Sequence, residues 1–163
     1  MKNNRIFKFT KVQRDRFEKL CDFLEKLPRE KFDFGTPYDT MPTQEGTCNS
    51  VGCAIGWTPS VFPKLVTRTH HGYFAWRKEA SCTYAGIADR LFGLPLQTAS
   101  DLFAPYDEWY IDCELPQCDE DTTPKQVAKM LRKFLARAEA GVYEMSEGGG
   151  RLQPKTKIKS KCT

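Results

Sequence analysis

The stretch TTPKQVAKMLRKFLARAEAG, residues 122–141, carries the clearest helical pattern in the sequence. Thr122 or Thr123 is expected to cap this helix, because a threonine hydroxyl accepts a hydrogen bond from the free N–H groups of the first turn. Pro124 suits that first turn, and Gly141 marks the expected end. The stripe of apolar residues between them predicts one buried face: Val127, Met130, Leu131, Phe134, Leu135 and Ala138.

A second long helix is predicted near the N-terminus, from about Thr10 to Leu27. Thr10 can cap its first turn, and Pro28 follows its end. The opposite face of this helix is of mixed charge. Its apolar face consists of Phe17, Leu20, Cys21, Leu24 and Leu27.

Two short helices are predicted in the middle of the chain. The first follows Thr83, and Gly93 stands where a left-handed C-terminal cap is expected. The second opens at Pro95 and ends before Pro105. Since Gly93 and Pro95 are so close, the chain must turn sharply between the two helices.

The segment CNSVGCAIGWTPSVFP, residues 48–63, predicts a short buried helix through Trp57 that Pro59 ends. Residues 65–78 predict a β-hairpin, because β-branched and aromatic residues flank His70-His71-Gly72. The whole pattern predicts a mainly α fold, with about five helices around one core and a small β-hairpin near residues 65–78. One globular helical domain is expected over residues 1–145, with a flexible basic tail over residues 146–163.

Length and composition indicate a single soluble domain. The chain has 163 residues, of which 40% are hydrophobic and 28% are charged. The longest apolar stretch, residues 51–57, is far too short to span a bilayer, and the N-terminal residues lack the pattern of a signal peptide. We therefore expect a cytoplasmic protein.

Negative charge is concentrated in residues 101–121, which contain eight carboxylates and no lysine or arginine. Aromatic residues stand among these carboxylates, and an aromatic anchor within a charged surface is typical of a protein interface. Alternatively, Trp109 folds into the core and the carboxylates are solvated. The predicted partner-binding residues are Asp107, Glu108, Trp109, Tyr110, Asp112, Glu114, Asp119, Glu120 and Asp121.

Positive charge is concentrated at the C-terminus. Residues 151–163 hold five basic residues and no acidic one, which leaves 20 basic against 21 acidic residues in positions 1–150. Such a tail, together with the basic face of the N-terminal helix, predicts weak, salt-sensitive binding of nucleic acid. A flexible solubilising end is the alternative. The candidate nucleic-acid-binding residues of the tail are Arg151, Lys155, Lys157, Lys159 and Lys161.

The seven cysteines are interpreted as reduced thiols. Cys48-x4-Cys53 and Cys113-x4-Cys118 supply four thiols, enough for a tetrahedral zinc site. Buried structural cysteines are the favoured alternative, so no metal or other cofactor is expected.

Two further hypotheses concern catalysis and DNA reading. A nucleophilic cysteine with His70 or His71 as its base would make the protein an enzyme. The helix pair joined at Gly93 also suits a helix-turn-helix reader, in which Gln97, Thr98 and Ser100 would meet base edges. Against groove reading, the second helix contains Asp101 and has no lysine or arginine. Ordinary core packing of this helix is therefore favoured.

Four short motifs follow one another along the chain: Cys48-x4-Cys53-Ala-Ile-Gly-Trp57, residues 88–94, residues 99–103, and the Thr-Pro start at Thr123. In this the chain resembles a group of small uncharacterised proteins from phages, plasmids and bacterial genomes. These proteins share the cysteine pair before Gly-Trp, the Gly-Leu joint and the Thr-Pro cap. The resemblance implies architecture and transfers no catalytic residue.

The resemblance implies a non-enzymatic accessory protein, encoded by a phage or another mobile element and located in the cytoplasm of a bacterial host. Such a protein binds a host or phage macromolecule, for example as an inhibitor of a host or defence protein. The leading expectation is a protein partner at the acidic segment. A nucleic-acid-associated protein is the alternative, and a cysteine-dependent enzyme is third.

Overall fold

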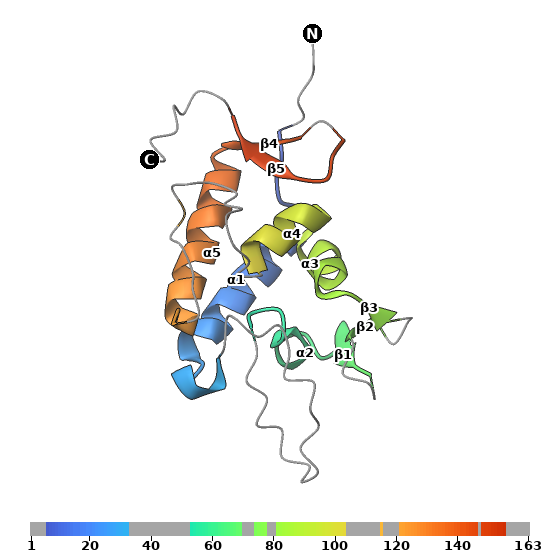
Figure 1. The fold of residues 1–163 in the computed structure, drawn as a ribbon, viewed down its shortest axis with the longest axis vertical. Helices are drawn as coiled ribbons and strands as arrows, with labels where there is room; N and C mark the ends of the chain where they lie inside the picture. The colour runs from blue at the N-terminus through green and yellow to red at the C-terminus, as the bar shows by residue number, and fades with distance from the viewer. Residues whose placement is uncertain are drawn as a thin grey trace.

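The computed structural model describes residues 6–32, 53–69, 74–77, 81–103, 115, 121–146 and 148–155. The fold is mainly α, as predicted, with five α-helices and two small antiparallel sheets in this part of the chain (Figure 1). The elements in chain order are α1 (Lys11–Lys26), the 3-10 helix η1 (Arg29–Lys31), α2 (Thr58–Val61), β1 (Val66–Arg68), β2 (Phe74–Trp76), β3 (Ser81–Cys82), α3 (Tyr84–Phe92), α4 (Leu96–Phe103), α5 (Pro124–Glu139), β4 (Tyr143–Met145) and β5 (Leu152–Pro154).

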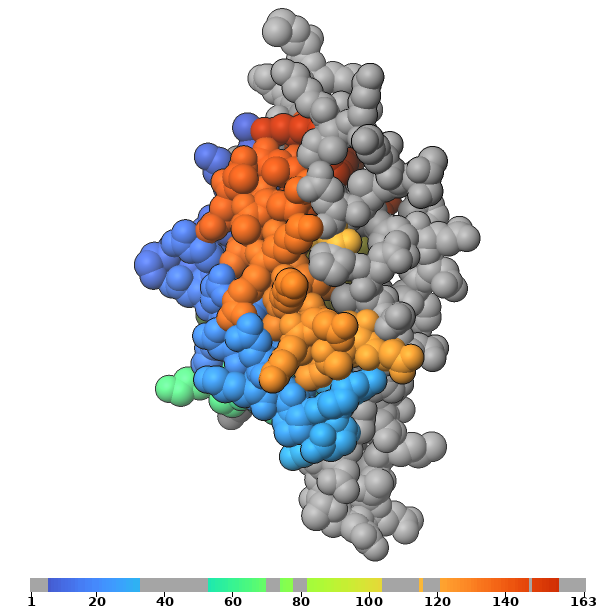
Figure 2. Space-filling view, turned by 90° about the vertical axis from the view of Figure 1, so that its left-hand side faces the viewer, coloured from blue at the N-terminus to red at the C-terminus, as the bar shows by residue number. Residues whose placement is uncertain are grey.

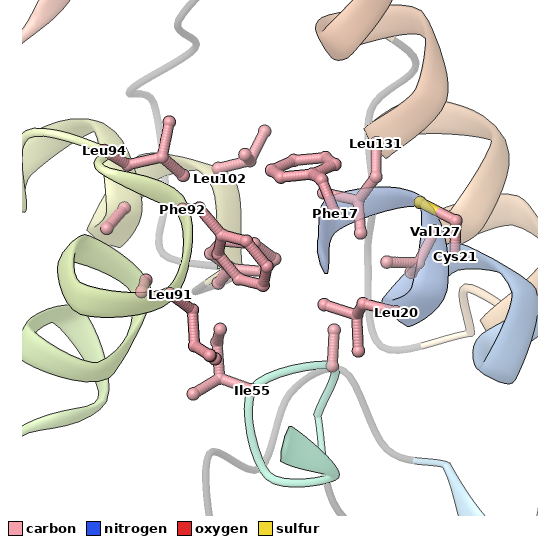
Figure 3. Packing of buried hydrophobic residues seen from close by; sticks show 14 of the residues in the cluster. Phe17, Leu20, Cys21, Ile55, Leu91, Phe92, Leu94, Leu102, Val127 and Leu131 are labelled. Atoms are coloured by element: carbon pink, nitrogen blue, oxygen red, sulfur yellow. The ribbon is translucent and has the colours of Figure 1, made fainter. Parts of the chain in front are cut away.

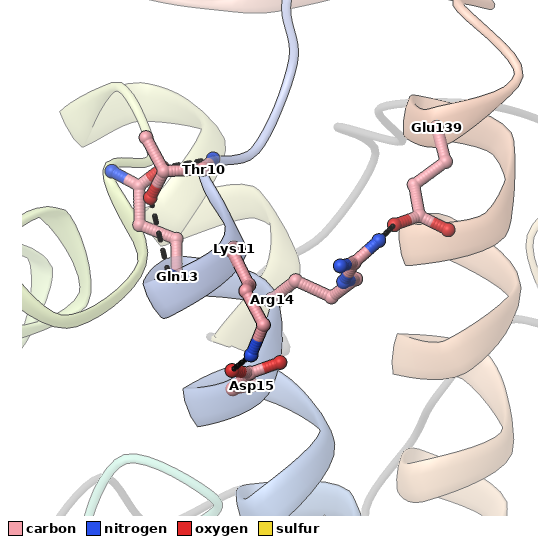
Figure 4. A network of polar contacts seen from close by, with 6 residues as sticks. All are labelled: Thr10, Lys11, Gln13, Arg14, Asp15 and Glu139. Atoms are coloured by element: carbon pink, nitrogen blue, oxygen red, sulfur yellow. Dashed lines mark hydrogen bonds and ion pairs between the residues drawn. The ribbon is translucent and has the colours of Figure 1, made fainter.

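The two long helices, α1 and α5, lie side by side (Figure 2, blue and orange). Each begins with a capping box, in which the cap threonine and a glutamine three residues later bond each other's backbone N–H groups. Gln13 Oε1 accepts from Thr10 N at 2.8 Å, and Gln126 Oε1 accepts from Thr123 N at 2.8 Å. Figure 4 shows the first of these boxes. The predicted caps are confirmed, with Thr123 rather than Thr122 as the cap of α5.

The core forms where α1 meets α5, α3 and α4 (Figure 3). Phe17 of α1 is fully buried, and its ring centroid lies 5.0 Å from that of Phe92, 6.1 Å from that of Phe134 and 6.4 Å from that of Phe103. Aromatic rings at such separations attract one another in addition to the gain from burial. One ring of α1 therefore contacts aromatic rings of three other helices.

The joint between α3 and α4 forms as predicted. Gly93 ends α3 in the left-handed conformation with φ of 67°, which a glycine adopts without steric cost. A Cβ at this position would lie 2.0 Å from Gln13 Nε2, so the joint packs directly on the capping box of α1. Arg16 reinforces this contact, because its guanidinium donates to the carbonyl oxygens of Arg90 (3.4 Å) and Leu91 (3.2 Å) at the end of α3.

The prediction of a short helix that passes through Trp57 and ends at Pro59 is wrong in the position of the helix. Residues 54–57 form turns, and α2 begins at Thr58, with Pro59 in its first turn. Proline suits a first turn because its missing N–H would have no intrahelical partner there, so Pro59 marks a start rather than an end. Burial of the segment is confirmed, since Cys53, Ala54 and Ile55 are almost completely inaccessible.

The hairpin predicted near residues 65–78 is also confirmed. β1 and β2 pair antiparallel, with Val66 opposite Trp76 and Arg68 opposite Phe74. β3 adds a further strand beside β2, which the sequence pattern did not indicate. β2 is thus the central strand of this sheet, a position that fixes its side chains.

The C-terminal hairpin differs from the expectation that a flexible tail begins at residue 146. Gly148 and Gly149 have positive φ, and β5 returns to pair with β4. Leu152 of β5 is fully buried, and its N–H donates to Thr98 Oγ1 of α4 at 2.7 Å. Burial of this leucine explains why the strand packs on the domain. Residues 156–163 of the expected tail lie outside the described part of the chain.

An ion pair joins this hairpin to α4. Arg151 Nε lies 2.9 Å from Asp101 Oδ2, and the aspartate side chain is only 3% exposed. Gln97 Nε2 also donates to Asp101 Oδ1 at 2.9 Å. A carboxylate withdrawn from water to this degree requires a cationic partner, so the pair holds the C-terminal hairpin against α4.

No helix in the described ranges is both long and apolar enough to cross a bilayer.

We expect Arg151→Gln to lower the free energy of unfolding by about 3 kcal/mol, because the buried carboxylate of Asp101 loses its cation. Urea unfolding measures this loss. Adding Asp101→Asn should recover part of it, since the charge is removed together with its partner. A double variant as unstable as the sum of the two single changes would show that Arg151 and Asp101 do not interact.

Candidate functional site

Most residues proposed for function from the sequence lie outside the described residues. This holds for eight of the nine predicted partner-binding residues (Asp107, Glu108, Trp109, Tyr110, Asp112, Glu114, Asp119 and Glu120), for Lys157, Lys159 and Lys161 of the tail, for His70 and His71, and for Cys48, Cys113 and Cys118. The described members are Cys53, Gln97, Thr98, Ser100, Asp121, Arg151 and Lys155. The partner-binding surface therefore stays a prediction.

The described candidate residues lie in different parts of the structure and have different surroundings. Cys53 is buried in the core, Asp121 is exposed just before α5, and Arg151 is engaged with Asp101. Phe103 and Leu115, which belong to the acidic segment by sequence, are buried. The acidic segment is thus anchored to the core at these points.

Charge is divided across α1, whose exposed face looked mixed in the sequence. At 100° per residue, Glu18, Asp22 and Glu25 fall on one flank of the apolar stripe, together with Lys11 and Arg14, whereas Arg16 and Lys19 fall on the other. Towards α5, Glu18 and Asp22 contact the guanidinium of Arg132 at 3.0 and 2.5 Å, and Glu25 contacts it as well. Burial acts to lower the pKa of Arg132, but hydrogen bonds to Glu18 and Glu25 outweigh it and raise this pKa above its ordinary value.

The other flank of α1 is basic. Arg16 reaches the end of α3, and the Nζ atom of Lys19 lies 5.4 Å from the ring centroid of Phe62. We use the name basic side for this flank together with α2 and α3, which contact α1, and with β1 and β2, which contact α2 and α3 respectively (Figure 1). Its described basic residues are Arg16, Lys19, Lys64, Arg68, Arg77 and Arg90; the described residues of those neighbouring elements and their connections contain one acidic residue, Asp89.

An arginine–tryptophan cluster, formed by Trp76, Arg77 and Arg90, lies on the basic side. The Cζ atom of Arg77 is 5.6 Å from the indole centroid of Trp76, and that of Arg90 is 6.0 Å from it. Both distances lie within the range of cation–π attraction. Trp76 is partly buried against the core, whereas Arg77 and Arg90 are exposed residues. The cluster therefore presents two guanidinium groups on a supported aromatic ring.

The backbone of Arg77 is strained. Its φ is +50°, the one positive φ of a non-glycine residue in the described chain. A left-handed conformation costs an ordinary L-residue roughly 1–2 kcal/mol. The N–H of Arg77 donates to Leu65 O at 2.7 Å, which helps to hold this turn at the end of β2. Strain of this kind, held by surrounding structure, is a reason to look for function.

Chemically, the cluster suits an anionic ligand that also has a flat face. A guanidinium donates paired hydrogen bonds to phosphate oxygens, and its plane stacks on aromatic rings. Indole and guanidinium planes are also the groups on which unpaired bases stack in nucleic-acid complexes. The described basic side thus offers donors for phosphate oxygens and planar groups for base stacking, the two kinds of contact that nucleic-acid binding uses.

The buried thiol of Cys21 does not suit nucleophilic catalysis. Burial raises the pKa of the Cys21 thiol from 9.0 to about 12, with the nearby Arg132 acting in the opposite direction. A thiol with this pKa stays protonated at neutral pH and is a poor nucleophile. Among the described residues, no group of three or more His, Cys, Asp or Glu side chains is arranged to hold a metal ion.

The helix-turn-helix hypothesis fails at Thr98. This side chain was a candidate for contact with base edges, but it is fully buried and accepts a hydrogen bond from Leu152 N. Asp101 on the same helix is engaged with Arg151. α4 is therefore a packing helix that fastens the C-terminal hairpin.

Sequence reasoning missed the arginine–tryptophan cluster. Trp76 and Arg77 are adjacent in sequence, but Arg90 reaches the indole only because α3 packs beside β2. The division of charge on α1, in contrast, was available as a signal, since it follows from helical geometry once the apolar stripe is identified.

Comparisons with models of protein families, with curated proteins and with solved structures give no match for this chain.

We expect Arg77→Gly to change the free energy of unfolding by less than about 1 kcal/mol. Relief of the left-handed strain offsets the lost cation–π contact and the added chain entropy of glycine. Lys129→Gly, in the middle of α5 and also exposed, is the matched control and should lower stability by about 1 kcal/mol. Thermal and urea unfolding measure both; a loss above about 2 kcal/mol for Arg77→Gly would assign Arg77 a structural role.

The raised pKa of Cys21 predicts a loss of stability at alkaline pH. Above pH 9.0 the unfolded chain releases the thiol proton while the folded protein retains it until about pH 12, so rising pH favours unfolding. The stability advantage of the wild type over Cys21→Ala should be constant below pH 9.0 and then shrink by up to about 1.4 kcal/mol per pH unit. Urea unfolding at several pH values measures it; parallel curves for the two proteins would contradict the assignment.

Proposed function

We propose that this protein is a non-enzymatic accessory protein that binds nucleic acid through its basic side. The observation that carries the proposal is the partly buried indole of Trp76 with the guanidinium groups of Arg77 and Arg90 over its ring. The described basic side supplies additional positive charge from Arg16 and Lys19. Such charge gives sequence-independent attraction to a phosphate backbone.

Nucleic-acid binding was the alternative that the sequence offered, with the N-terminal helix and the C-terminal tail as its site. The proposed site is now the basic side instead of the tail. The basic face of the N-terminal helix is retained, since Arg16 and Lys19 belong to it. Arg151 is replaced as a candidate contact, because its guanidinium already pairs with the buried carboxylate of Asp101. The resemblance to small proteins of phages and plasmids supports a mobile-element origin and action in the cytoplasm of a bacterial host.

A protein partner at residues 107–121 is the second candidate. It is supported by the high density of carboxylates there and by the aromatic pair Trp109 and Tyr110. The two candidates differ in which surface attracts the partner. A nucleic acid is repelled by the acidic segment and attracted by the basic side, whereas a basic protein is attracted by the acidic segment and repelled by the basic side.

The test is direct binding of labelled single-stranded and duplex oligonucleotides, followed by fluorescence anisotropy. We expect binding to weaken roughly 10- to 100-fold between about 50 and about 200 mM salt, as expected for a few phosphate contacts. Arg77→Gly and Arg90→Gln should each weaken binding several-fold, because each removes a contact and a positive charge. Lys129→Gln on α5 removes the same charge elsewhere and should leave binding almost unchanged.

Two results would contradict the proposal. The first is no binding to any oligonucleotide at the lower salt concentration. The second is an equal loss for Arg77→Gly, Arg90→Gln and Lys129→Gln, which would indicate general charge attraction without a site. Circular dichroism of each variant confirms that the fold is retained.

A further inference from the structure

We propose that the arginine–tryptophan cluster recognises single-stranded nucleic acid, with an unpaired base stacked on the planar groups of Trp76, Arg77 and Arg90. The inference rests on the proposed function and narrows the partner from nucleic acid in general to unpaired strands. It is carried by the geometry of the cluster and by the elements that support it.

The aromatic ring is held in a fixed position. Trp76 ends β2, the central strand of its sheet, and pairs in register with Val66, which is fully buried. Part of the indole packs against the hydrophobic core. The indole therefore gives the guanidinium groups over it a fixed support, and a base that stacks on this cluster meets a surface that is partly ordered before binding, which favours affinity.

The two guanidinium groups reach the ring from different elements. Arg77 follows β2 directly and is positioned by its left-handed backbone, whereas Arg90 stands on α3, with its Cζ 6.0 Å from the indole centroid. Each guanidinium can stack on a base with its plane and donate to a phosphate oxygen with its edge. The cluster thus combines stacking and phosphate contacts at one place.

An unpaired strand suits these groups better than a duplex does. Inside a duplex each base is already stacked between its neighbours, so its face is accessible only at the ends or after the base is flipped out. A duplex is normally read by an element that enters a groove. The described helix that sequence reasoning offered for this role, α4, has Thr98 buried and Asp101 engaged with Arg151. Stacking on the cluster requires no such element.

The basic residues near the cluster suit the path of a strand. Arg16 donates to the backbone of Arg90 and Leu91, so α1 lies beside the end of α3 that carries the cluster. Lys19, one turn farther along α1, is exposed. A strand whose base rests on the cluster can therefore bring its neighbouring phosphates towards Lys19. Contacts of this type bind with little sequence preference.

The test compares three ligands of equal length, about 20 nucleotides, with the whole protein at low salt. They are a pyrimidine single strand, the same strand with several abasic sites, and a duplex. The abasic strand keeps its phosphates but lacks bases to stack. We expect the intact single strand to bind roughly tenfold more tightly than the other two ligands, the size of effect that stacking of one base produces.

Variants of the aromatic residue give a second measurement. Trp76→Leu should reduce binding of the intact strand roughly tenfold, to the level of the abasic strand, because the stacking surface is lost. Trp76→Phe keeps an aromatic ring and should retain most of the affinity. Lys129→Gln is the charge control. If Trp76→Leu does not fold, the comparison of the intact and abasic strands on the wild-type protein still decides the question.

The outcomes separate this inference from the proposed function. Equal affinity for the intact strand, the abasic strand and the duplex would overturn base stacking; if Arg77→Gly still weakens all three, nucleic-acid binding at the basic side stands. Absence of binding to every ligand would overturn both. Tighter binding of the duplex than of the single strand would also reject this inference and would indicate a duplex-binding surface instead.

Discussion

Burial of Phe17 is the contact on which the rest of the structure depends. Its ring meets Phe92 of α3 at 5.0 Å, Phe103 of α4 at 6.4 Å and Phe134 of α5 at 6.1 Å. Since α1 contacts all three of these helices, the positions at which it starts and ends affect the whole core. The capping box of Thr10 and Gln13 fixes the start, and the same glutamine contacts the α3–α4 joint at Gly93. A local capping motif and the global arrangement of helices are therefore coupled.

The same burial divides the surface charge. Because the apolar stripe of α1 faces the core, its polar residues are left on two separate flanks. One flank carries Glu18, Asp22 and Glu25, which converge on Arg132 of α5. The other contains Arg16 and Lys19 and continues into α3. A protein with little net charge over most of its length thereby has a flank of α1 that carries the basic residues Arg16 and Lys19.

Elements with signals close in sequence were predictable. The caps at Thr10 and Thr123 and the left-handed Gly93 are confirmed, since each depends on a few neighbouring residues. Elements that depend on distant contacts were missed. β5 forms because Leu152 packs near Thr98 and Arg151 meets Asp101, about fifty residues away in sequence, and the GGG segment before it looked like the start of a flexible tail. The arginine–tryptophan cluster also depends on distant contacts and was missed for this reason.

The role of Pro59 was predicted wrongly because proline is common both just after the end of a helix and in the first turn of a helix. The residue type alone does not distinguish the two positions.

The choice of an arginine at position 77 supports a role beyond folding. The left-handed backbone there, with φ of +50°, costs arginine roughly 1–2 kcal/mol, and glycine would not bear that cost. Arginine recovers roughly 0.5–1 kcal/mol from its contact with Trp76 and a similar amount because glycine loses more chain entropy on folding. These contributions nearly cancel, so stability gives no preference for arginine over glycine at this turn. What arginine adds is a guanidinium held 5.6 Å from the indole centroid, beside a second guanidinium from α3. The nucleic-acid ligand proposed above would use both this positive charge and a planar surface.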